Sequence, residues 1–583
     1  MKNNSTKYFI ILSTLIFFTV CAVFFPATDP APKLTCDDFV YVGEWARLEF
    51  TIENIIYYFK NQVLYLYSPL VMVSLMFDKL LYGENFIFGA HITNLLLHAV
   101  SAVLFFKLLT MLHFYRKGKS SLRIPQVLAA AVSLLWAVHP QRAESVAWIC
   151  ERKDTLVTLF LLCSALSFIT FFRKKKLDIA GAIPLAASFL CKPMLITFPA
   201  LAAVFIFCET RGKKFFANLK YLIPSLIVSC GYVILNSKQM GKSAAESTIS
   251  NPSRVLEILG NIGRYFAKTF NPLDLNTHYS ENLPLTDIIP LAAVTITFVI
   301  LLKSRYKKFS LYCLLPCIAL FVISVLPVSG VVPIGSTGFA DRYSYIPSLF
   351  IAIATGFIFA AISDKYTRAV PVILVISGVV ILFYCTETRF NCTLYRDTDK
   401  YLEFAISRPN PHPRMLFSYG HELLIQKKYD DAEKVANYFN TPDAKGTAKD
   451  TFYRTITALI NINRGNIDYG LAEFDKVIFS KEVGYLRGFS RNFAKDNLPL
   501  AARLHLQRGN IKKATTIFAI LADFYGVHDQ AERSFYYGIN SMILGKYAAA
   551  EKHFESALKI HPENMRFKTN LNEARKRQGK TAL

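Results

Sequence analysis

The chain has 583 residues, of which 53% are hydrophobic and 19% are charged, and its formal net charge is +24. The apolar share exceeds that of an ordinary soluble domain, and long uncharged runs indicate a polytopic membrane protein. Much of the positive charge lies in short loops between apolar segments, which favours topogenic charge over a nucleic-acid-binding surface. We therefore expect a lipid bilayer as a partner and no nucleic acid. The cysteines form no CxxC pair and show no metal-ligand spacing.

Long apolar runs recur along the chain up to about residue 388. The first, from about Tyr8 to Phe25, is long for a signal peptide and lacks a small-residue cleavage site, so we expect a membrane anchor. Further spans are predicted at about 86–112, 125–138, 153–172, 178–191, 193–208, 219–236, 286–302, 309–327, 344–362 and 369–386. Residues 1–388 are thus expected to form an all-α bundle of about eleven spans.

The connections between these spans alternate in charge. Basic loops follow residues 112, 172, 208, 302 and 362, and the positive-inside rule places them and the N-terminus in the cytoplasm. The exoplasmic connections are then 26–85, 139–152, the Lys192-Pro193 turn, 237–285 and 328–343. An odd number of spans also places the C-terminal region on the exoplasmic side.

The composition turns polar and helical beyond Arg389. Residues 389–413 are expected to be a linker, and 414–583 an α-solenoid of about four tetratricopeptide repeats. The clearest repeat has its small, aromatic and proline residues at the repeat spacing, namely Gly545, Tyr547, Ala550, Phe554, Ala557 and Pro562. Such a solenoid presents a concave face, which binds extended peptide or another protein more often than it catalyses.

Two neighbouring carboxylates, Asp37 and Asp38, directly follow the first span. Carboxylates in this position can accept a proton or hold a metal ion. In the second span, His91, Asn94 and His98 recur at i, i+3 and i+7 and share one helix face, where interhelical hydrogen bonding is the favoured role.

A polar cluster runs from His139 to Asp154 on the predicted exoplasmic side. A continuous helix there places Glu144, Trp148 and Arg152 on one stripe. Charged groups at a membrane edge are costly unless they are paired or functional. One interpretation is therefore a functional cluster, and the other is a Glu144–Arg152 network that fixes the helix ends.

Two more cations lie on the same predicted side. Lys192 is either a point charge on a lipid phosphate or an anchor at the headgroups. Arg342, before the tenth span, suits a phosphate fork, with Asp341 as its simplest partner and Tyr343 beside it. Asn391-Cys392-Thr393 matches a glycosylation sequon.

Taken together, these motifs resemble a known family. Cys36-Asp37-Asp38, HPQRAESVAWICERKD at 139–154, Lys192-Pro193-Met194 and ADRYSYIPS at 340–348 are similar to the transmembrane-and-tetratricopeptide-repeat proteins. These are large-fold GT-C glycosyltransferases related to protein O-mannosyltransferases, and the chain looks like a bacterial member. The resemblance implies a GT-C-type transmembrane helix bundle followed by the repeat solenoid. ERKD at 151–154 stands where animal members usually show glycine, arginine, a small residue and aspartate.

The resemblance also implies roles for particular residues. Asp37 or Asp38 is expected to act as the base or as a ligand of a divalent metal, Mg or Mn, although no ligand cluster establishes a metal. Basic residues are expected to hold the donor phosphate, namely Arg152, Lys192 and Arg342. The supporting residues of the site are expected to be His91, His139, Glu144, Asp154, Asp341 and Tyr343.

The function expected on this basis is transfer of a mannose-like sugar from a polyprenyl-phosphate donor to a protein Ser/Thr or glycan acceptor. The repeat domain would present the acceptor, and the expected location is a bacterial inner membrane with the site on the periplasmic side. Two alternatives stay open: a non-catalytic repeat-bearing scaffold for envelope proteins, and a surface-polysaccharide polymerase or ligase.

Overall fold

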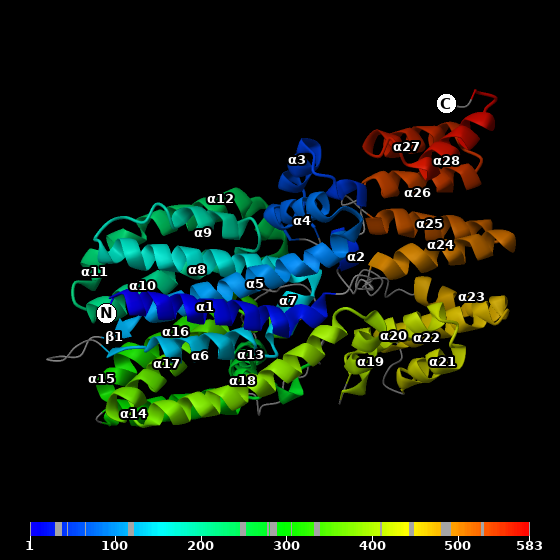
Figure 1. Ribbon diagram of the computed structural model, residues 1–583. Coiled ribbons are helices and arrows are strands. Elements are labelled where there is room, and N and C mark those ends of the chain that lie inside the picture. The colour runs from blue at the N-terminus through cyan, green and yellow to red at the C-terminus, as the bar shows by residue number, and fades with distance from the viewer. Residues whose placement is uncertain are drawn as a thin grey trace. The chain divides into compact units, whose positions relative to one another are not determined.

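The computed structural model describes residues 2–28, 38–42, 45–63, 66–114, 122–244, 252–276, 279, 288–304, 306–331, 339–408, 411–441, 448–479, 491–525 and 530–581. Over these residues the chain is helical apart from two short antiparallel strands, β1 (His113–Phe114) and β2 (Leu122–Arg123). The predicted all-α class is therefore confirmed for the described residues. The chain divides into two compact units, Met1–His412 and Pro413–Leu583 (Figure 1).

The first unit is built from helices of very different length. In chain order they are α1 (Lys2–Phe24), α2 (Asp38–Val42), α3 (Ile52–Lys60), α4 (Pro69–Tyr82), α5 (Phe86–Met111), α6 (Gln126–Ala137), α7 (Arg142–Ala147), α8 (Arg152–Arg173), α9 (Ala182–Phe189), α10 (Phe198–Thr210), α11 (Phe215–Asn218), α12 (Ile223–Ala244), α13 (Pro252–Phe270), α14 (Ile289–Lys303), α15 (Lys307–Phe309), α16 (Leu315–Val325), α17 (Pro347–Lys365), α18 (Ala369–Leu394) and α19 (Thr398–Ser407). Short 3-10 turns join several of them, including η4 (Ile149–Glu151), η5 (Pro193–Thr197), η7 (Pro272–Asp274) and η11 (Asp341–Ser344).

Eight helical segments of the described chain are long and apolar enough to cross a membrane, which indicates a multi-pass membrane protein. They are Ser5–Ala27, Pro69–Met111, Ile149–Arg173, Pro193–Thr210, Phe215–Leu235, Lys307–Val328, Pro347–Lys365 and Ala369–Leu394. Two shorter apolar helices, Gln126–Ala137 and Ile289–Lys303, coincide with two more predicted spans. The predicted span at 178–191 contains only the eight-residue α9, which at 1.5 Å per residue is about 12 Å long.

Helix α5 is the centre of the first unit, with α1, α4, α6 and α8 packed against it (Figure 1). Two polar side chains on its buried face bind neighbouring elements. Asn94 Nδ2 donates to the Trp148 carbonyl at 3.1 Å, and His98 Nε2 donates to the Ala137 carbonyl at 2.9 Å. The interhelical hydrogen bonding predicted for these residues is therefore confirmed. Helix α5 thereby holds the end of α6, through His98, and the segment between α7 and α8, through Asn94.

The second unit is a series of helices in which each packs against the next. They are α20 (Pro413–Ile425), α21 (Tyr429–Tyr438), α22 (Ala448–Asn463), α23 (Ile467–Ile478), α24 (Arg491–Gln507), α25 (Ile511–Tyr525), α26 (Gln530–Ile543), α27 (Tyr547–Ile560) and α28 (Met565–Lys576). Ala550, Phe554 and Ala557, predicted to pack one helix pair, are fully buried. Gly545 has a φ of +71°, a conformation that glycine adopts without strain, and ends the turn between α26 and α27.

Candidate functional site

Four consecutive charged residues, Glu151 to Asp154, lie where α8 begins, and all four are buried. The stretch before them is not one continuous helix. Trp148 has extended backbone angles, φ −87° and ψ 120°, so α7 ends at Ala147 and α8 begins at Arg152 after the turn η4. The predicted stripe of Glu144, Trp148 and Arg152 is therefore wrong. Glu144 and Arg152 also have different ion-pair partners, so no Glu144–Arg152 pair fixes these helix ends.

Arg152 binds the bundle with every nitrogen of its guanidinium. It forms an ion pair with Asp78 of α4. Its Nε donates to Asn94 at 2.7 Å, and its Nη2 donates to the Ala90 carbonyl at 2.7 Å. Its side chain has no exposed surface, and that of Asp78 is 2% exposed. A buried charge is tolerated when it is paired and hydrogen-bonded in this way, so Arg152 joins α4 and α5 to the start of α8.

Asp154 binds the lysine that sequence analysis singled out. Lys192 Nζ donates to Asp154 at 2.6 Å, and Ser145 Oγ donates to the other carboxylate oxygen at 3.3 Å. Lys192 is buried, which differs from an anchor at the headgroups. An ammonium has three N–H donors. Within the described chain Lys192 donates to Asp154, so it has further donors for another acceptor. Its Nζ also lies 5.0 Å from the centre of the Tyr343 ring.

Arg342 lies in η11 and binds two carboxylates. Its Nη1 forms an ion pair with Glu144, its backbone N–H donates to Glu144 at 2.8 Å, and its Nε is 3.3 Å from Glu151. Within the described residues its Nη2 has no hydrogen-bond partner. The guanidinium lies 4.9 Å from the centre of the Tyr343 ring. Arg342 and Lys192 therefore lie next to the same aromatic ring.

Of the two predicted catalytic carboxylates, the structure describes Asp38. Asp38 begins α2, is 2% exposed, and accepts a hydrogen bond from the Cys150 backbone N–H at 2.8 Å. Asp37 lies outside the described residues. Across the described chain, no three His, Cys, Asp or Glu side chains are grouped as metal ligands. The predicted Mg or Mn site stays a prediction.

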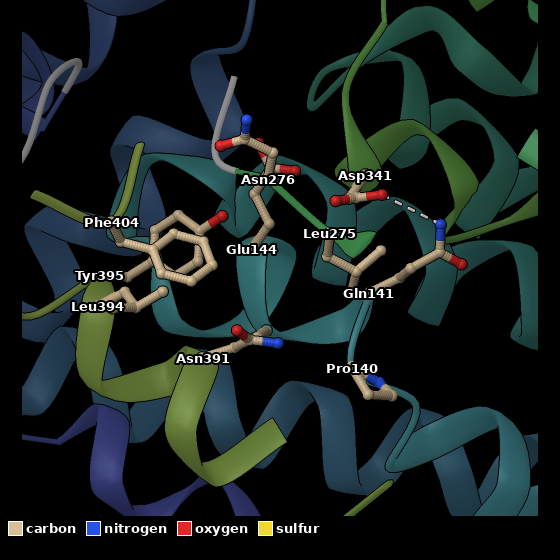
Figure 2. Close-up of a pocket in the computed structure, with 11 residues that line it drawn as sticks. Pro140, Gln141, Glu144, Leu275, Asn276, Asp341, Asn391, Leu394, Tyr395 and Phe404 are labelled. Carbon is tan, nitrogen blue, oxygen red and sulfur yellow. Dashed lines mark hydrogen bonds between the residues drawn. The ribbon is translucent and has the colours of Figure 1, made fainter. Parts of the chain in front are cut away.

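A pocket lies beside Arg342, between α7, η11, the residues after η7, and the α18–α19 region (Figure 2). Asp341 forms part of its wall and accepts hydrogen bonds from Gln141 at 3.1 Å and from Tyr279 at 2.7 Å. Glu144 also lines it. The empty volume is about 280 Å³, part of which is open to solvent.

Burial changes the protonation of both carboxyl groups in the pocket wall. It raises the pKa of Glu144 to about 7, although the Arg342 charge opposes the shift, and the nearby Asp341 and Glu151 charges add to it. Burial likewise raises the pKa of Asp341, against hydrogen bonds from Tyr279 and Gln141. Arg342 stays charged, since Glu144 and Glu151 raise its pKa against the effect of burial. The site therefore contains a carboxyl group that titrates near neutral pH.

The structure brings together five of the predicted residues in one cluster: Glu144, Asp154, Lys192, Arg342 and Tyr343. Arg152 instead binds α4 and α5. His139 is buried, with its Nε2 3.1 Å from the Thr269 carbonyl, and His91 is buried in α5. Sequence reasoning missed Asp78, although a lone aspartate within the apolar run 69–82 signals a buried partner for a cation. Nothing in the sequence singled out Tyr395 or Phe404 as pocket residues.

Comparison with known proteins found curated relatives. The chain is 32% identical to human protein O-mannosyl-transferase TMTC4 over 152 residues, 24% of this chain and 20% of the relative. It is 23% identical to Caenorhabditis elegans protein O-mannosyl-transferase F38B6.6 over 395 residues, 64% of this chain and 53% of the relative. Human protein O-mannosyl-transferase TMTC3 is 30% identical over 173 residues, 28% of this chain and 16% of the relative.

The chain thus spans from about a sixth to about half of the length of these relatives. No family model and no solved structure matches it. The similarity is to proteins that are named protein O-mannosyl-transferases.

Replacing Asp78 by Asn is expected to destabilise the first unit strongly. The substitution leaves the Arg152 charge buried without its carboxylate, which typically costs about 3–5 kcal/mol. The measurement is the midpoint of thermal unfolding of the purified full chain in detergent. Glu53→Gln on α3, an exposed carboxylate, is the control and is expected to change stability by less than about 0.5 kcal/mol. Equal midpoints for the two variants would contradict the role of the pair.

The stability of the site is expected to depend on the protonation of Glu144. Because its pKa rises from 4.5 to about 7 on folding, the native state holds a proton that the unfolded chain releases. This contribution is fully present below pH 4.5 and is lost as the pH rises through about 7. The unfolding midpoint of the wild type should therefore fall more steeply across this window than that of Glu144→Gln. Parallel curves would show that Glu144 does not titrate there.

Proposed function

We propose that this chain is a membrane glycosyltransferase that transfers a mannose-like sugar from a polyprenyl-phosphate donor to a protein Ser/Thr hydroxyl or a glycan. Three observations support the proposal. The curated relatives are named protein O-mannosyl-transferases. The described chain has eight helical segments able to cross a membrane, as an enzyme with a lipid-linked donor requires. Several residues of the motifs that resemble this family meet at one cluster of paired charges.

The observation that carries the proposal is the hydrogen-bonding state of the cations. Arg152 has protein partners for all of its nitrogens, so we assign it a positioning role. Arg342 and Lys192 each form an ion pair and keep donors that no described group accepts from. They lie beside one ring, Tyr343. A phosphate bound between them would receive a planar fork from one and a point charge from the other.

This arrangement suits the leaving group of the reaction. The acceptor hydroxyl oxygen would attack the anomeric carbon, and the bond from that carbon to the phosphate oxygen would break with inversion. Negative charge then develops on the departing phosphate, where Arg342 and Lys192 would stabilise it. Because a glycosyl phosphate already has a good leaving group, the protein must mainly supply a base for the acceptor proton.

We assign the base role to Asp37 and a positioning role to Asp38. Asp38 accepts a hydrogen bond from the Cys150 N–H, directly before the charged residues at the start of α8. Through this hydrogen bond, Asp38 joins the segment after the first span to the charged residues at the start of α8. Its neighbour Asp37 is then the carboxylate left to accept the proton of the acceptor. We propose no step that depends on a metal ion.

We further propose the sidedness that the charge pattern predicts. The site would face the periplasm of a bacterial inner membrane, with the N-terminus in the cytoplasm. The second unit, as a solenoid of tetratricopeptide repeats, would present the acceptor on the same side.

The expected result of Asp37→Asn is a loss of sugar transfer by about 10²- to 10⁴-fold, the usual effect of removing a general base. Asp38→Asn should retain most of the transfer, because an amide oxygen can still accept from the Cys150 N–H. The measurement is transfer of labelled sugar from polyprenyl-phosphate mannose by membranes that contain equal amounts of each protein.

Two outcomes would overturn this assignment. Loss of transfer with Asp38→Asn and retention with Asp37→Asn would exchange the two roles. Equal transfer by the wild type and both variants would remove these carboxylates from catalysis and favour the scaffold.

A further inference from the structure

Five lysines lie in two connections between candidate membrane spans. One connection follows α8, and the other joins α10 to α11. Figure 1 shows α10 and α11 at the end of the bundle where the N-terminus lies. A span ends or begins next to each connection, so in a membrane both lie at the level of the lipid headgroups. These lysines, which we call the basic surface, are Lys174, Lys175, Lys176, Lys213 and Lys214.

The fold holds the two connections together. Arg173, the last residue of α8, binds the carboxylate of Glu209 in α10 through Nε at 2.8 Å and Nη2 at 3.3 Å. Next to this pair, the rings of Phe172 and Tyr221 lie 5.2 Å apart in edge contact. Two groups of positive charge that are far apart in the sequence are thereby brought to one surface.

The lysines of the basic surface are not neutralised by the protein. All five side chains are exposed, and within the described chain their ammonium groups form no ion pair and no hydrogen bond. The acids nearest in sequence are bound elsewhere. Glu209 pairs with Arg173, and Asp178 is buried and accepts hydrogen bonds from Ser167 and Gly181. Cations gathered in this way repel one another and attract anions from outside the chain.

Two of these lysines have a backbone conformation that favours glycine. The φ of Lys175 is +56° and that of Lys214 is +52°. Lys175 follows the end of α8, where the helix dipole favours a cation. Lys214 directly precedes α11, where the dipole disfavours one. Neither backbone conformation nor local electrostatics therefore accounts for a lysine at position 214, which points to a partner for its charge.

An exposed aromatic ring follows Lys214 closely in the sequence. Phe216 in α11 is 84% exposed, whereas its neighbour Phe215 packs edge-on against Phe207, with ring centres 6.0 Å apart. Lysines beside an exposed aromatic ring are typical of a segment at a membrane surface. The ring enters the boundary between headgroups and acyl chains, and the cations bind the headgroups.

We propose that the basic surface binds the phosphate groups of anionic phospholipids, with Phe216 inserted beside their acyl chains. Each lysine would supply a point charge to a phosphate oxygen, as basic clusters next to membrane spans do with anionic lipids. Loop charges that only orient the spans act during insertion. They require neither a common surface in the folded chain nor the absence of neighbouring acids, and the basic surface has both.

The test is native mass spectrometry of the purified full chain in detergent, with dioleoyl phosphatidylglycerol or dioleoyl phosphatidylcholine added. The wild type should bind phosphatidylglycerol more tightly. The double variant Lys213→Gln, Lys214→Gln should weaken that binding by about fivefold for each cation removed. The double variant Lys213→Arg, Lys214→Arg keeps both charges and should bind phosphatidylglycerol like the wild type.

The matched control is the double variant Lys552→Gln, Lys559→Gln in α27. It removes the same charge from two exposed lysines of the second unit, which also form no ion pair within the described chain. Its affinity for phosphatidylglycerol should equal that of the wild type.

Four results would overturn the proposal. Equal affinity of the wild type for the two lipids would exclude a preference for anionic headgroups. Equal phosphatidylglycerol binding by the Lys213, Lys214 glutamine variant and the control would place the binding elsewhere. A loss of binding in the arginine variant as large as in the glutamine variant would show a structural effect. Displacement of phosphatidylglycerol by an equal concentration of inorganic phosphate would show a site for the free anion instead of a lipid.

Discussion

The rest of the site depends on the pairing of four consecutive charged residues, Glu151 to Asp154, at the start of α8. A charge taken out of water must be compensated by a partner and by hydrogen bonds, and these four are buried. Arg152 pairs with Asp78, and Asp154 pairs with Lys192. Glu151 binds both Lys153, at 2.9 Å, and Arg342. One helical turn thereby determines where α4, η5 and η11 lie.

The cations of this network differ in how many of their hydrogen-bond donors are used within the protein. Lys153 donates to the Cys150 carbonyl as well as to Glu151, and the guanidinium of Arg152 is fully bonded. Both therefore hold the fold together. Lys192 is paired with one carboxylate and Arg342 with two, and in the proposed function a phosphate would accept hydrogen bonds from their remaining donors without breaking these pairs. The carboxylates of the same network place these two cations beside Tyr343 before any ligand arrives, so less order must be gained on binding.

Part of this structure could be predicted from the sequence. The apolar runs predict the helix bundle. The charged motif residues predict Glu144, Asp154, Lys192 and Arg342 as site residues, because residue type and short-range spacing can be read directly from the sequence. Pairing is not local: Arg342 binds Glu144 198 residues away, and charge type alone does not choose among several acids. The extended Trp148 breaks a helix that the sequence pattern favours. The pocket residues Tyr395 and Phe404 were missed because a polar stretch after the last span resembles a linker.

The most direct measurement of the central claim is a cryo-EM structure of the full chain with polyprenyl-phosphate mannose bound. We expect the phosphate within hydrogen-bond distance of Arg342 Nη2 and Lys192 Nζ, with Arg152 still paired to Asp78. A phosphate bound by Arg152 after its separation from Asp78, or one remote from both Arg342 and Lys192, would contradict the account.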